Sequence, residues 1–139
     1  MWIAMSNQGM SKPLFLPITS VAINSNIYIN ECLIPRLLPF THKYHSDFNY
    51  LFWPDLAGAH YSKERTAWVD ENLYFVDKES NAPNVPQERP IANFWGCLTH
   101  KVYEGGWQAT NQTNWFVAFN LNWRNLTWIF YKISLEALR

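Results

Sequence analysis

The sequence shows no excess of either charge, since 11 Lys and Arg residues balance 11 Asp and Glu residues. Charge alone is therefore not expected to hold the chain on nucleic acid. Cysteine is also scarce, because Cys32 and Cys97 are the two thiols and they form no C-x-x-C pair. This spacing gives no zinc site and favours reduced, partly buried thiols in an intracellular protein.

Long uninterrupted apolar runs are missing as well. The first residues have no basic flank or apolar core of a signal peptide, and Asn120, Asn122 and Arg124 interrupt the aromatic tail. We therefore expect no membrane partner, and no motif indicates a small-molecule substrate. The 139 residues are 48% hydrophobic and 16% charged, which predicts at most one folded domain with a real core.

The N-terminal third of the sequence predicts a hairpin and then a helix. Trp2 to Met5 and Lys12 to Ile23 are strand-like and are joined through a Ser-Asn-Gln-Gly turn. Apolar residues then recur every three or four positions on one helix face, namely Ile29, Leu33, Leu37, Phe40 and Tyr44. Pro35 and Pro39 should kink or divide this helix because neither has an N–H group.

The middle of the sequence predicts a strand that ends beside an acid. Tyr50 to Trp53 is continuously apolar, which is typical of a buried strand that would deliver Asp55 just past its end. Ser62 is suited to cap a helix through about Glu71. Leu73 to Val76 predicts another short strand. Pro83 to Glu88 predicts a loop.

The most regular helix pattern begins at Pro90, a residue that fits a first helical turn. Apolar residues follow at helical spacing, namely Ile91, Phe94, Trp95, Leu98 and Val102. Gly105 and Gly106 provide a stop. The aromatic residues of this stripe and Trp53 are interpreted as core.

Two blocks carry a family resemblance: Trp-Pro-Asp-Leu-Ala-Gly-Ala-His at 53–60 and Arg-Pro-Ile-Ala-Asn-Phe-Trp-Gly at 89–96. They resemble the last two catalytic blocks of a Tc/mariner-type DDE transposase, whose second block normally reads Pro-Ile-Glu-Asn-Phe-Trp-Gly. The 36 residues between Asp55 and Ala92 fall within the range that this family uses. Further segments match in order from Met1 to about Ala109, at 5–9, 22–25, 36–40 and 101–109.

The resemblance implies an α/β fold of the ribonuclease H-like type, in which a mixed five-stranded sheet is flanked by helices. The first, central strand of that fold would lie upstream of Met1, so the fold is expected to be partial if Met1 is the true start. We therefore expect a partial catalytic domain over residues 1–109 and a divergent tail over residues 110–139.

The resemblance also implies chemistry with Mg²⁺ or Mn²⁺, since the family cuts and joins DNA with two metal ions held by three carboxylates. Asp55 matches the second, metal-binding acid. The first acid is absent from the sequence, and Ala92 stands where the third acid is expected. Metal binding is therefore expected to be weak or absent, with negligible turnover. Glu88 precedes Pro90 and is not expected to replace the lost acid.

Other polar residues admit more than one interpretation. His60 matches a histidine of the family block, where a role near the substrate and a packing or capping role are both open, the second being favoured. His42 and His45 favour a solvated helix face over a metal pair. Basic residues that could contact phosphates form no stripe, namely Lys12, Arg36, Lys43, Arg65 and Arg89.

The tail beyond Ala109 no longer resembles the family, and Asn111 to Lys132 shows no helical pattern in the observed reading frame. A one-base shift of that frame is compatible with a family-like C-terminal helix, so we favour a frameshift over an ordinary divergent aromatic tail that packs on the core. The first hypothesis is thus an inactive remnant of a nuclear transposase. The alternative is a retained, non-catalytic module that binds DNA or an intact transposase.

Overall fold

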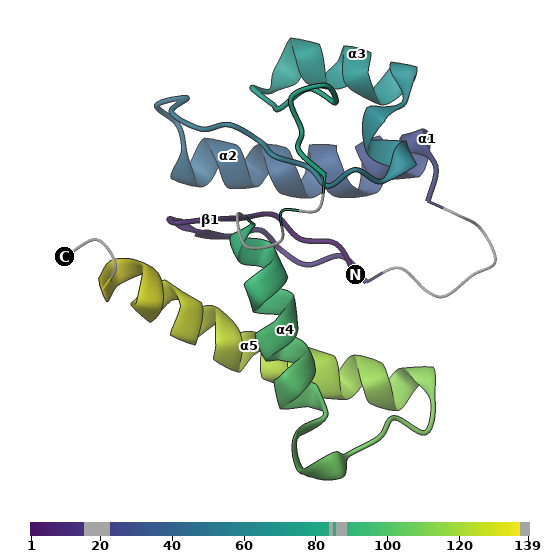
Figure 1. The fold of residues 1–139 in the computed structure, drawn as a ribbon, viewed down its shortest axis with the longest axis vertical. Helices are drawn as coiled ribbons and strands as arrows, with labels where there is room; N and C mark the ends of the chain where they lie inside the picture. The colour runs from purple at the N-terminus through teal and green to yellow at the C-terminus, as the bar shows by residue number, and fades with distance from the viewer. Residues whose placement is uncertain (16–22, 84, 86–88, 137–139) are drawn as a thin grey trace. The chain divides into compact units, whose positions relative to one another are not determined.

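The computed structural model describes residues 1–15, 23–83, 85 and 89–136. The chain divides into two compact units, residues 1–6 with 10–83 and residues 7–9 with 84–139. Helices and one small two-stranded sheet make up the described residues, which confirms a mixed fold of helices and strands (Figure 1). The sheet in these residues is much smaller than the five-stranded sheet that the resemblance implies.

The N-terminal residues form the predicted hairpin. Strands β1 (Met5–Ser6) and β2 (Gly9–Met10) pair with each other, and an antiparallel bridge joins Trp2 to Leu14. The backbone N–H of Ala4 also donates to the Ser11 hydroxyl at 2.9 Å. The second arm starts at Gly9 rather than Lys12, and residues 16–22 of its predicted range lie outside the described residues.

The predicted proline-containing helix forms, divided into three consecutive segments: α1 (Ser25–Ile27), η1 (Tyr28–Leu37) and α2 (Leu38–Tyr44). The middle segment is π-helical, and the Leu38 N–H donates to the carbonyl five residues earlier. Because Pro35 lacks an N–H and crowds the preceding turn, it is accommodated by the wider register. The prolines therefore change the helix type without ending the helix.

The buried face of this helical segment follows the predicted stripe. Leu33, Leu37 and Phe40 are buried, whereas Ile29 and Tyr44 are partly buried. Tyr28 and Cys32 are also buried, at 1% exposure each. The stripe is therefore wider than the spacing predicted, and it brings a phenol and a thiol into the core.

Helix α3 (Lys63–Asn72) begins where Ser62 predicts, and the Ser62 hydroxyl accepts from the Arg65 backbone N–H at 3.3 Å. The two predicted strands around it shrink to one parallel bridge between Phe52 and Phe75. The prediction of a buried strand at Tyr50 to Trp53 is wrong, since Leu51 is 63% exposed. A single bridge leaves the outer face of this segment uncovered, which explains the exposure.

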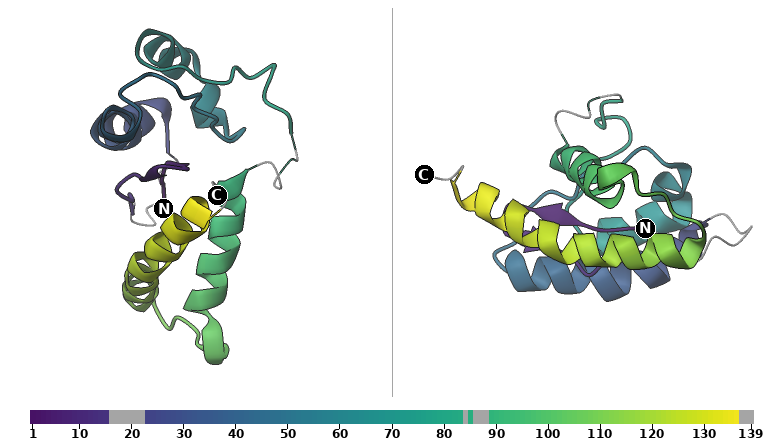
Figure 2. Two further views of the ribbon diagram at one scale, coloured as in Figure 1. Left: turned by 90° about the vertical axis from the view of Figure 1, so that its left-hand side faces the viewer. Right: turned by 90° about the horizontal axis from the view of Figure 1, so that it is seen from below.

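The second unit is formed by two packed helices, α4 (Pro90–Val102) and α5 (Gln112–Glu136), with a short turn η4 (Glu104–Gly106) after the first. Figure 2 shows α4 in green beside α5 in yellow-green in both views. The α4 prediction is confirmed at both ends. The helix begins at Pro90, and Gly105 adopts a left-handed φ of 74° just past its C-terminal end. Phe94, Leu98 and Val102 of α4 and Phe119, Trp123 and Leu126 of α5 are buried. The rings of Phe94 and Trp123 meet at 5.3 Å between centroids.

Helix α5 corrects the expectation that the tail has no helical pattern. Trp115, Phe119 and Trp123 recur every four residues, and Trp115 stacks on Phe119 at 4.6 Å between ring centroids. Asparagine side chains obscured this stripe; Asn120, for example, donates to the carbonyl of Phe116 four residues earlier. A protein structure does not test the proposed frameshift, which is a property of the gene, or the end of the family resemblance at Ala109, which is a matter of ancestry. Both remain predictions.

No described helix is long and apolar enough to span a membrane.

Candidate functional site around Asp55

Asp55 follows the parallel bridge at Phe52 by three residues, and its side chain is 64% exposed. The segment before it is fixed by Asn81, whose amide is buried. The Asn81 Nδ2 donates to the carbonyl of Pro54 at 2.8 Å, and its Oδ1 accepts from Trp53 Nε1 at 2.8 Å. Sequence reasoning missed Asn81, because an asparagine in a loop carries no signal that separates it from solvated neighbours.

The carboxylate of Asp55 is engaged by its own loop. Its Oδ1 accepts from the Ala57 backbone N–H at 2.9 Å and lies 2.7 Å from His60 Nδ1. His60 belongs to the short 3-10 turn η2 (Gly58–Tyr61), which holds the imidazole over the carboxylate. Asp55 therefore caps a turn and pairs with an imidazole.

His60 is also packed against the core of the first unit. Its ring lies 4.3 Å from the ring of Tyr28, centroid to centroid, and its side chain is 13% exposed. The favoured packing role of His60 is therefore observed, together with a pairing to Asp55 that the sequence did not indicate. Burial raises the pKa of Tyr28, and the nearby Trp2 indole and Arg65 guanidinium partly offset this rise.

Arg65 is the second residue that sequence reasoning misjudged. Its side chain is completely buried, although the sequence places it among the basic residues that could contact phosphates. The guanidinium carbon lies 5.0 Å from the ring centroid of Phe75 and 5.5 Å from that of Tyr61. Burial lowers the pKa of Arg65, an effect opposed by nearby Tyr28, Tyr61 and Asp70. The signal was the four-residue spacing to Val69 and then to Leu73, which puts Arg65 on the buried stripe of α3.

These residues do not fit a site for two divalent cations. Two closely spaced cations need several carboxylates, and no group of three or more His, Cys, Asp or Glu side chains converges within the described ranges. Ala92 lies in the first turn of α4 and offers a methyl group. Glu88, the residue considered as a substitute, lies outside the described residues. The expectation that Asp55 binds one ion weakly stays a prediction.

The sequence also pointed to His42 and His45. His45 contacts the hairpin, where its Nε2 is 2.9 Å from the Ser6 hydroxyl, and His42 faces solvent.

The chain matches no protein-family model, and no curated protein matches it either. The structural evidence that bears on function is therefore the geometry around Asp55.

Proposed function

We propose that this chain derives from the catalytic domain of a Tc/mariner-type DDE transposase and that it has lost metal-dependent DNA cleavage. The observation that carries the proposal is the pair of sequence blocks at 53–60 and 89–96, with Asp55 in the first and Ala92 in place of a glutamate in the second. Their order and separation match the family, together with the shorter matching segments on either side.

Two structural features support this origin. Asp55 follows a segment that forms a parallel bridge with Phe75, as expected for an acid that once stood at the end of a sheet strand. Pro90 begins a regular helix, so position 92 lies in a first helical turn, where a glutamate would have its side chain near a helix N-terminus. Both features agree with a reduced ribonuclease H-like domain.

The loss of activity follows from the ligands. The family's chemistry requires acids that hold two cations against the DNA phosphate, and a methyl group at Ala92 supplies no oxygen. Asp55 Oδ1 is already engaged by His60 and the Ala57 N–H, so an ion would have to compete with these contacts. Binding of Mg²⁺ or Mn²⁺ sufficient for strand cleavage is not expected.

A second candidate function is a retained module that pairs with an intact transposase in the nucleus. The observation that favours a protein partner over DNA is the exposure of Phe116, Val117 and Leu121 on α5, in a chain with zero formal net charge. The remnant remains the preferred function, because it also explains Ala92.

The DNA around the coding sequence tests the proposed origin. Sequencing should reveal inverted terminal repeats on both sides and, upstream of the Met1 codon, a stretch that encodes a strand with the first acid. A one-base change of frame near the codon for Asn114 should encode the family's C-terminal helix. A host gene with neither repeats nor an upstream transposase-like stretch would contradict the proposal.

A further inference from the structure

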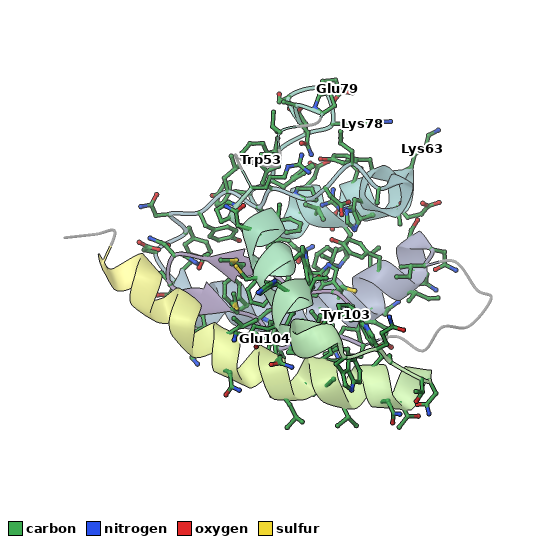
Figure 3. All side chains as sticks on the ribbon, turned by 60° about the horizontal axis from the view of Figure 1, so that its bottom comes forward. Trp53, Lys63, Lys78, Glu79, Tyr103 and Glu104 are labelled. Atoms are coloured by element: carbon green, nitrogen blue, oxygen red, sulfur yellow. The ribbon has the colours of Figure 1, made fainter. Side chains whose placement is uncertain are left out.

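Residues 50–53 are the strongest unexplained segment in the described part of the chain. Tyr50 and Phe52 pack against the core of the first unit, whereas Leu51 and Trp53, the second of which is labelled in Figure 3, are exposed. This alternation is the pattern of a strand with one buried face. The segment nevertheless makes a single bridge to a neighbouring segment, so it pairs as a strand at one position only among the described residues.

One edge of this segment has unpaired backbone groups. The Phe52 N–H donates to the Tyr74 carbonyl at 2.7 Å, and the Phe52 carbonyl accepts from the Val76 N–H at 2.9 Å. Because successive residues of a strand point their backbone groups to opposite edges, the N–H and carbonyl of Leu51 face away from this bridge. They form no hydrogen bond with any residue that the structure describes. An open edge of this kind is a template for a further strand.

The same edge carries no charge. Residues 48–54 contain no Lys, Arg, Asp or Glu, whereas edge strands of soluble proteins are commonly protected by a charged side chain, often a lysine. Two copies of this edge can therefore meet without like charges among the paired residues. Each copy also offers the backbone donor and acceptor that Leu51 of the other copy lacks, so one symmetric pairing satisfies both copies at once.

From this edge we propose that the chain forms a dimer in which residues 50–53 of two copies pair as antiparallel strands through the backbone of Leu51. A two-fold axis brings the same residues of both copies together, as a closed dimer requires. The exposed Leu51 and Trp53 side chains of the two copies then pack on each other on the outer face of the sheet. The dimer uses a surface other than α5, and the inference holds whatever the ancestry of the chain.

The small size of this interface sets the affinity to expect. Stable protein–protein interfaces bury about 800 Å² on each partner, an area that a few residues of one strand do not supply. The dimer should therefore dissociate on dilution. Sedimentation velocity of the wild-type protein should show monomer at low protein concentration and dimer at high concentration. A wild type that stays monomeric at every concentration would overturn the proposal.

Leu51→Lys tests whether this edge is the interface. Dimerisation should weaken by about tenfold or more, because a lysine on an edge strand and like charges across a strand pair both oppose pairing. Leu121→Lys on α5 is the matched control, since Leu121 is 64% exposed and Leu51 is 63% exposed. This variant should dimerise as the wild type does. Unchanged dimerisation of Leu51→Lys would overturn the proposal, and loss of the dimer in Leu121→Lys would instead assign the interface to α5 and overturn it as well.

A second measurement covers the case in which Leu51→Lys does not fold. In the wild-type protein, amide hydrogen exchange at the Leu51 N–H, followed by NMR, should be slower at high than at low protein concentration. The Phe75 N–H is the internal control, because it points away from the bridge on the opposite edge and should exchange at the same rate at both concentrations. Exchange at Leu51 that does not depend on concentration, or protection at Phe75 in its place, would reject this interface without any variant.

Discussion

The two units of this chain are stabilised in different ways. Among its described residues the first unit buries four polar side chains, namely Ser11, Thr41, Arg65 and Asn81, whereas the buried side chains described in α4 and α5 are all apolar. Contacts of the first unit also join distant residues, such as Trp53 and Asn81, which are 28 positions apart. The described core of the second unit comes from the helix pair α4 and α5. A polar, long-range core and an apolar, helical core should therefore respond differently to the same kinds of change.

The largest effect is expected in the apolar core. Phe94→Ala removes a side chain with 0% exposure that meets Trp123 edge to face at 5.3 Å. Core Phe→Ala changes cost about 3–5 kcal/mol, so α4 and α5 should separate and lose helicity. Urea unfolding followed by circular dichroism measures this loss. Asn93→Ala, at the exposed neighbouring position, is the control and should be nearly neutral; equal effects of both variants would refute the interface.

The next effect is expected in the polar core. Asn81→Ala removes the amide that bonds Trp53 Nε1 and the Pro54 carbonyl. Each partner left buried without a bond costs about 1–3 kcal/mol, so we expect a loss of roughly 2–3 kcal/mol. Limited proteolysis should then cut the Asp55 loop faster. Lys78→Ala is the control, because Lys78 is exposed and lies three positions before Asn81 in the same loop; an unchanged cleavage rate in Asn81→Ala would show that the loop is held by other contacts.

A smaller effect is expected at the start of α3. Ser62→Ala removes the hydroxyl that accepts from the Arg65 N–H. Loss of such a cap costs about 1 kcal/mol, and Ser62→Asp should restore most of it because aspartate is an equally good cap. The comparison is made by urea unfolding of both variants. Equal destabilisation by alanine and aspartate would mean that Ser62 does not act through capping.

The smallest effect on stability concerns the two thiols, one in each unit. Burial raises the pKa of Cys32 to about 11, whereas Cys97 is exposed. A raised folded-state pKa favours the neutral thiol, so its contribution is complete below the unfolded value of 9.0 and is lost as the pH rises towards 11. At pH 9 the loss is still small, because the thiol is only partly ionised in the unfolded chain.

Thiol modification with iodoacetamide measures the same difference directly. At pH 8 Cys97 should react and Cys32 should stay protected until urea unfolds the first unit, because the thiolate is the reactive form. Cys97→Ala should leave a protein that is not labelled in its native state. Rapid native labelling of this variant would contradict the burial of Cys32.

The sequence predicts those parts of the fold that depend on local periodicity. Helix α4 and its buried stripe, including Phe94, follow from spacing alone, and Ser62 marks the start of α3 because capping is local. The burial of Arg65 was also encoded in spacing, but a charged residue on an apolar stripe is easily assigned to the surface. The Asn81 contacts could not be predicted, because they join loops whose closeness depends on the whole first unit.

The candidate site shows the same division. The blocks that contain Asp55 and Ala92 are visible in the sequence, and so is the alanine at the position where the resemblance implies a third acid. The pairing of Asp55 with His60 and the contact of His60 with Tyr28 depend on how η2 meets the helical segment. Pattern matching therefore finds the residue, and only the fold reveals which group engages it.

The most direct test of the proposed loss of function is nicking of supercoiled plasmid DNA by the purified protein in Mg²⁺ and in Mn²⁺, beside Asp55→Ala prepared in the same way. We predict that the wild type and the variant both produce nicked circles at the rate of buffer alone. Metal-dependent nicking by the wild type that Asp55→Ala abolishes would contradict the proposal that the chain has lost DNA cleavage.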